Sequence, residues 1–331
     1  MLESEDAPLF EVDSPLGEIE YGLGRGLTLG DTGLHIGGFT TVAFDREDGD
    51  PGELEIDGVN FLVLLEPNEY VRGFMELEVG DFFRWKTNES SIESDTTAKF
   101  ERLYGDLIVG DPITLRTGKF QTPVGRWNLV PAEPFVWTPI EPAFLEVAFD
   151  EHQTGVAALG SFHPLAGSLD YWVYGQVIDP LDPSEDPEPG DHSVGGRLQF
   201  GRSIEQWSVG GSFLATEIGG QWSYLGGLDT EFSIDRLLVT SELTLQQGDI
   251  QDRDLWDVYV QGVFEVVPTF DLVARYERFD GQGRDEDAHI GDFGITWIPK
   301  PYLLFKASYR VTDKQTDVVR RGLSMSFSFI F

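Results

Sequence analysis

The chain has 331 residues, and its 58 acidic and 23 basic side chains give a formal net charge of −35. This charge excludes the basic surface that nucleic-acid phosphates require, so no nucleic-acid partner is expected. The absence of cysteine excludes disulfides and thiolate metal sites, and 13% aromatic with 40% hydrophobic residues exclude a disordered chain.

The N-terminal segment, residues 1–33, has the weakest pattern. It contains the glycine-rich stretch GEIEYGLGRGLTLGD, which alternates only in part. We expect an arm inside a lumen, an additional strand or a disordered tail. The chain does not open on a basic region followed by an apolar one, so any signal peptide is expected to have been removed already.

From residue 34 onward, apolar and polar residues alternate with period two, which predicts β-strands. For example, Val71, Met75 and Leu77 alternate with Arg72 and Glu76. Sixteen such runs are predicted, at 34–45, 53–65, 70–84, 98–109, 113–124, 153–162, 168–178, 192–201, 206–216, 221–233, 236–247, 255–266, 270–279, 288–298, 302–312 and 318–331.

The length of these runs indicates strands that cross a membrane. Globular strands usually have about five or six residues, whereas a tilted transmembrane strand needs about 9–11. Short and long connectors also alternate, which is typical of outer-membrane barrels. A soluble β-sandwich or lipocalin-like barrel is the alternative, but a soluble barrel of sixteen strands would be too wide to fill with side chains. The predicted fold class is therefore all-β, a transmembrane antiparallel β-barrel.

Aromatic residues and the C-terminus support this prediction. Residues such as Trp297, Phe305 and Tyr309 fall on the apolar phase near strand ends, as in an interfacial aromatic girdle. The last strand reads RGLSMSFSFIF, with large apolar residues at odd positions up to Phe331 and serines between them. The apolar side chains would face lipid and the serines would face water.

These features together resemble a Gram-negative outer-membrane porin of the sixteen-stranded kind, with eighteen strands as the alternative if residues 1–33 also pair. The segment GKFQTPVGRW, Gly118 to Trp127, resembles a segment of the phosphate-selective porin O/P group. The resemblance implies an outer-membrane homotrimer that contacts lipid and lipopolysaccharide and lets small hydrophilic solutes diffuse passively. It also implies that the third outer loop folds inward.

The longest connector, residues 126–152, is the third outer loop by count. Loops beyond about 12–15 residues are usually functional. Its prolines and apolar side chains suit packing against a barrel wall, so it is predicted to constrict the channel. A surface flap or a contact between protomers is the alternative.

Charged residues on the polar phase and in this loop are the candidate pore-lining and constriction residues: Arg72, Glu76, Arg102, Asp106, Arg116, Glu133, Glu141, Glu146, Arg197, Arg275, Lys306 and Arg310. Carboxylate-lined constrictions favour cations, whereas dense arginine and lysine ladders select anions. Acids outnumber bases, so we expect a general or weakly cation-selective pore, in which most single charges form wall ion pairs. Whether the acidity serves selectivity or a saline habitat stays open.

Catalysis has little support, because the five histidines are scattered and no hydrolase or nucleotide-binding motif occurs. No enzyme activity and no cofactor are therefore predicted, apart from weak binding of divalent cations at acidic outer loops. Two other functions stay open. One is a barrel that acts as a sheath for another protein, such as a cytochrome, and the other is a barrel hydrolase.

Overall fold

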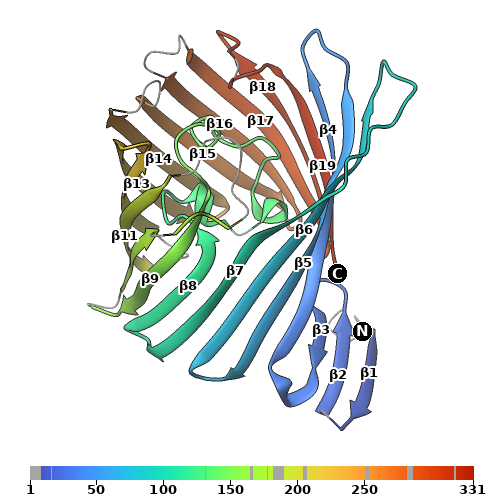
Figure 1. Ribbon diagram of the computed structural model, residues 1–331. Coiled ribbons are helices and arrows are strands. Elements are labelled where there is room, and N and C mark those ends of the chain that lie inside the picture. Colours follow the sequence, from blue (N-terminus) through green and yellow to red (C-terminus); the bar gives the residue numbers. More distant parts are fainter. Residues whose placement is uncertain are drawn as a thin grey trace.

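The computed structural model describes residues 9–15, 17–130, 132–164, 167–176, 178–181, 190–203, 207–249, 254–281, 286–316 and 318–331. Sixteen antiparallel strands, β4 to β19, form a barrel that closes where β19 pairs with β4 (Figure 1). Their bounds are β4 Leu34–Glu47, β5 Glu53–Asn68, β6 Val71–Lys86, β7 Thr97–Gly110, β8 Ile113–Gln121, β9 His152–Phe162, β10 Ser168–Gln176, β11 His192–Ser203, β12 Trp207–Ile218, β13 Gln221–Ile234, β14 Leu237–Gly248, β15 Leu255–Val267, β16 Phe270–Gly281, β17 Glu286–Lys300, β18 Leu303–Thr312 and β19 Gly322–Ile330.

Each of the sixteen predicted runs corresponds to one of these strands, which confirms the predicted fold class. The largest difference is at the last strand, which begins at Gly322 rather than at residue 318. Val318 and Val319 precede it and pack into the barrel interior, where Val319 is fully buried. Their apolar character imitates a strand, but long-range packing holds them in a loop.

The N-terminal segment forms a small sheet beside the barrel. The strands β1 Phe10–Ser14, β2 Gly17–Gly22 and β3 Gly26–Leu29 are antiparallel, and β3 pairs with the start of β4 through Leu27 and Ile36. The sheet lies next to the C-terminus, at the end of the barrel that carries the short turns (Figure 1). Its strands therefore extend the sheet at this rim without joining the barrel wall, whose count stays at sixteen.

In the barrel, the distribution of apolar and charged side chains between surface and interior is the reverse of that in a water-soluble protein. Large apolar side chains on the outward face are exposed, for example Phe293 at 60% and Leu228 at 60%. Inward-facing charged side chains such as Arg275, Glu277 and Asp292 are almost completely buried. The alternation of the strands thus places the apolar phase outside and the polar phase in the lumen. Among the described residues, no helix has the length and apolar character that would let it cross a membrane.

Candidate functional site

Residues 122–151, here called the inner loop, connect β8 to β9 and fold into the lumen (Figure 1). The loop contains two short 3-10 helices, η2 Trp127–Leu129 and η3 Glu133–Phe135. The sequence placed this connector at residues 126–152. The structure begins β9 at His152, and the loop departs directly after Gln121.

Glycines allow the chain to turn from β8 into the lumen. Gly118 has φ +126°, and a Cβ atom there would lie 2.1 Å from the Leu103 carbonyl oxygen. Gly125 has φ +64°, and its Cβ would lie 2.1 Å from Oε2 of Glu242. Both glycines belong to the segment GKFQTPVGRW. They allow a left-handed backbone and close packing, which explains this part of the motif in steric terms.

Two arginines hold the middle of the inner loop against the wall. The guanidinium of Arg275 on β16 donates to the carbonyl oxygens of Ile140 and Glu141 at 2.9 and 3.0 Å. Arg310 on β18 donates to the Glu141 carbonyl at 2.7 Å. Asp292 on β17 lies between the two arginines and accepts from both, at 2.5 Å from Arg275 and 2.9 Å from Arg310. These groups form one buried, charge-assisted network.

Further contacts fix the rest of the loop. Glu242 accepts the backbone N–H of Trp127 at 2.6 Å and the hydroxyl of Tyr259 at 2.5 Å. Glu277 accepts the backbone N–H of Ala143 at 2.6 Å. Other wall donors to the loop are Thr296 to the Trp137 carbonyl, Lys306 to the Glu133 carbonyl, and Thr41 and Ser328 to the Glu133 carboxylate.

An apolar core lies between the second half of the loop and the wall. Phe144, Leu145 and Phe149 are at most 2% exposed and pack in one cluster with wall residues such as Tyr259 and Phe279. Burying large apolar side chains contributes about 1.5–3 kcal/mol each. One side of the lumen is therefore filled by the protein's own packed side chains.

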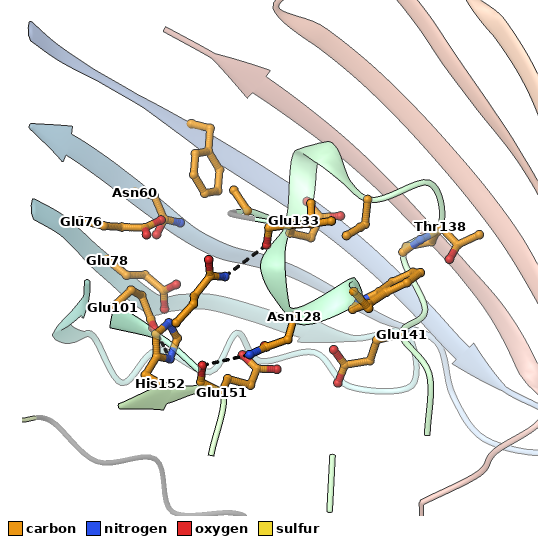
Figure 2. A pocket seen from close by; sticks show the side chains of 17 residues that line it. Asn60, Glu76, Glu78, Glu101, Asn128, Glu133, Thr138, Glu141, Glu151 and His152 are labelled. Carbon is orange, nitrogen blue, oxygen red and sulfur yellow. Dashed lines mark hydrogen bonds and ion pairs between the residues drawn. The ribbon is translucent and has the colours of Figure 1, made fainter. Parts of the chain in front are cut away.

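A cavity of about 220 Å³ remains on the other side of the loop, next to β4–β7. Figure 2 shows acidic side chains that approach it from both the wall and the loop. Its carboxylates are Glu76, Glu78 and Glu101 from the wall, and Glu133, Glu141 and Glu151 from the loop. Among the described residues, its lining includes no lysine or arginine; His152, Asn60, Asn128 and Trp127 are among the other lining residues.

Two basic side chains next to this cavity pair with its wall carboxylates. Arg102 binds Glu76 at 2.5 Å, and Lys99 lies 3.3 Å from Glu78 and 2.9 Å from Glu101. Glu101 reaches the lumen because β7 carries a bulge there: Glu76 pairs with Arg102, but the next residue of β6 pairs with Phe100. The bulge turns two consecutive residues of β7 inward and adds a carboxylate to the cavity.

Two loop carboxyls in this cavity hold protons more tightly than usual. Burial, reinforced by the nearby charges of Glu151 and Glu146, raises the pKa of Glu141 to about 8, although Arg275 and Arg310 oppose the shift. The pKa of Glu151 is also raised, first by burial and then by the charges of Glu101 and Asp150. Ionisation of the loop side of the cavity therefore depends on pH near neutrality.

A second cavity, of about 270 Å³, lies at the end of the barrel that carries the long loops. Glu146, Ile140, Arg310, Asp45 and Arg320 are among its lining residues. Ile140 lines this outer cavity and its neighbour Glu141 lines the inner one. The two cavities therefore lie on opposite sides of this stretch of the inner loop.

The predicted site residues do not form one site but lie in several different places in the barrel. Glu76, Glu133 and Glu141 line the inner cavity, Arg102 pairs at its edge, and Glu146 lines the outer cavity. The remaining ones form ion pairs or anchors: Arg72 with Glu66, Asp106 with Arg116, Arg197 with Asp229, Arg275 and Arg310 with Asp292, and Lys306 with Glu133.

Among the lining residues that were missing from the sequence-based set are Glu101, Glu151 and His152. Strict alternation placed Glu101 on the outward phase, and only the bulge reverses it. Glu151 and His152 lay within the predicted loop, but no pattern in the sequence indicates which loop residues contact the wall. The three carboxylates close enough to share a metal ion, among the described residues, are Glu11, Glu18 and Glu20 on the exposed N-terminal sheet, not residues of the outer loops.

No protein-family model and no curated protein matches the sequence. Solved structures match the fold. OmpF of Salmonella typhi in complex with daunomycin is 11% identical, with a TM-score of 0.66, over 91% of this chain and 98% of that one. The anion-selective porin from Comamonas acidovorans and a loop L8 deletion mutant of OmpT, an outer membrane protein of Vibrio cholerae, are each 12% identical, with TM-scores of 0.63, over 90% of this chain and 99% of theirs. The chain therefore has the porin fold.

Proposed function

We propose that the protein is a passive diffusion channel for small hydrophilic solutes that prefers cations. The observation behind this proposal is the inner cavity, where six glutamates face the remaining space while the basic side chains are paired or hold the loop. Carboxylate rings in a pore attract cations and repel anions. The raised proton affinity of Glu141 makes this preference pH-dependent.

The outer membrane of a Gram-negative bacterium is the proposed location. A soluble protein rarely exposes apolar patches above a few hundred Å², whereas this barrel presents apolar side chains on strand after strand. Outward aromatic pairs such as Trp297 with Phe305 suit a membrane interface. OmpT of Vibrio cholerae, whose loop L8 deletion mutant is one of the solved neighbours, is an outer membrane protein.

A homotrimer in contact with lipid and lipopolysaccharide is the proposed assembly. One solved neighbour, OmpT folded in vitro, is described in trimer form. Mass measurement of the detergent-solubilised protein tests this assembly, and a monomeric mass at micromolar concentration would count against it.

The alternatives have less support. A sheath for another protein needs an open lumen, but the inner loop and its apolar core occupy a large share of this one. Phosphate selectivity needs unpaired basic groups along the pore, whereas Arg102, Arg116, Arg197 and Arg310 each pair with a carboxylate. No contact among the described residues supports a hydrolase, so we propose no enzyme activity.

Reversal potentials in a salt gradient across planar bilayers test the cation preference. The wild-type channel is expected to show stepwise openings and a potential of the sign that cation flow produces. Replacing Glu78 by Gln removes one cavity charge and leaves Lys99 with Glu101 alone, so E78Q is expected to shift the potential toward anions.

Glu69 provides the matched control, because it is exposed in the short turn between β5 and β6 and does not line the cavity. E69Q removes the same charge and is expected to leave the reversal potential unchanged. An anion-selective wild type would refute the cation preference, and a protein that forms no conducting steps would refute the channel itself.

A further inference from the structure

Two acidic side chains are buried as neighbours in the wall behind the inner loop. Asp257 on β15 and Glu277 on β16 are both 0% exposed. Glu277 pairs with Tyr259 and Asp257 with Phe279, so the two acids are diagonal neighbours on the inward face. Neither oxygen of Asp257 has a donor in the structure, and Oε2 of Glu277 has none either.

The charges around this pair do not balance it. The charged or titratable groups that face it are Glu242 on β14, Tyr259 on β15, Arg275 on β16, Asp292 on β17, Arg310 on β18 and, from the inner loop, Glu141. Both guanidinium groups bind Asp292 and the loop carbonyls. Arg275 Nε lies 3.6 Å from Glu277, and among the described residues no basic side chain forms an ion pair with Asp257 or Glu242.

Two ionised carboxylates buried as neighbours, away from water, repel each other and lose their hydration, so one proton between them is strongly favoured. The proton turns the repulsion into an O–H···O hydrogen bond. We propose that Asp257 and Glu277 form a proton-binding site, and that the proton they share keeps the inner loop docked against the wall.

The site is coupled to the loop through two direct contacts. Glu277 accepts the N–H of Ala143, and Arg275 donates to the Ile140 and Glu141 carbonyls. Without the proton, Asp257 becomes a second buried charge beside Arg275, whose Nε and one terminal nitrogen have no acceptor. The guanidinium is drawn toward Asp257 and away from the carbonyls, so losing the proton loosens the loop.

The same coupling works in reverse. An undocked loop lets water reach the pair, which then releases its proton more easily. Alkaline conditions therefore favour the undocked loop. This regulation rests on the proposed channel function for its electrical consequence, but the protonation itself is a property of the folded barrel.

Infrared spectroscopy of the reconstituted protein tests the proton directly. In an E141Q background, which removes the protonated carboxyl group of Glu141, the protein at neutral pH is expected to show the C=O stretching band of a protonated, buried carboxyl group, shifted in D₂O. D257N retains an N–H that can donate to Glu277 but no ionisable group, and E277Q is the second variant in case D257N does not fold; each is expected to lose this band. D106N is the matched control, because Asp106 is bound to Arg116 at 2.7 and 2.9 Å and should contribute no such band.

Single-channel recording between pH 6 and pH 10 tests the coupling. In a background with E141Q, which removes the separate titration of Glu141, alkaline pH is expected to increase the time spent in higher-conductance states. Adding D257N should abolish that increase. An infrared band that is absent in the E141Q background, or that persists in both variants on that background, would overturn the proton site. A band with pH-independent gating would overturn only its coupling to the loop, and a silent protein with the expected band would count against the proposed channel alone.

Discussion

Replacing Arg310 by Met should release the inner loop without disrupting the barrel. Arg310 is 3% exposed and donates to Asp292 at 2.9 and 3.0 Å and to the Glu141 carbonyl at 2.7 Å. Asp292 retains Arg275 as a partner, so its charge stays compensated. The loss that matters is the bond to the loop. A hydrogen bond to a charged group contributes about 1.5–3 kcal/mol, so the docking equilibrium should fall roughly 10- to 150-fold.

Planar-bilayer recordings at neutral pH measure this effect as the fraction of time in higher-conductance states, which R310M should increase. R116M is the matched control. Arg116 forms an equally close pair with Asp106, but its guanidinium lies over the rings of Tyr104 and Trp172 in the wall. R116M should lower thermal stability while leaving conductance fluctuations as in the wild type. Equal fluctuations in the two variants would refute the assignment of Arg310 as a loop anchor.

Three further outcomes are expected. Gly125→Ala should weaken loop docking, because its Cβ would meet Glu242 Oε2 at 2.1 Å in a left-handed backbone, whereas Gly226→Ala has open space and should be neutral in the same recordings. Glu141 is protonated below its pKa of about 8 and ionised above it, so cation preference should rise as pH passes that value; reversal potentials should show this step in the wild type and not in E141Q. Phe144→Ala should lower the free energy of unfolding by about 3–5 kcal/mol, measured by denaturant titration, because the ring is fully buried. An E141Q channel that keeps the pH step, or a Phe144→Ala protein as stable as the wild type, would contradict the respective argument.

The strands of the barrel could be predicted because their signal is local. Alternation with period two places each residue on one face or the other, whatever lies next to it. The last strand illustrates this: Leu323, Met325, Phe327 and Phe329 lie on the outward phase, and Ser328 faces the lumen, where it binds Glu133. The inward course of the connector after β8 was also expected, from its length, its prolines and its resemblance to porin loops.

Long-range structure decided what each charge does. Arg275 and Arg310 look like pore-lining bases in the sequence, but the inner loop packs over them and turns them into donors to its backbone. Glu101 changes face through a single bulge. The arginine contacts join residues more than 100 positions apart, and the bulge depends on pairing with a neighbouring strand, neither of which alternation encodes.

The amino-acid sequence by itself determined the sixteen strands, their order and the face that their side chains occupy outside the bulges, because these follow from the local period of the chain. The tertiary structure alone decided that one side of the lumen is filled by the inner loop, that the opposite side is a cavity lined by glutamates, and that Asp257 is buried next to Glu277 with no hydrogen-bond donor of its own. The physical reason is that burial and charge pairing are properties of a packed interior, which exists only after distant segments have come together.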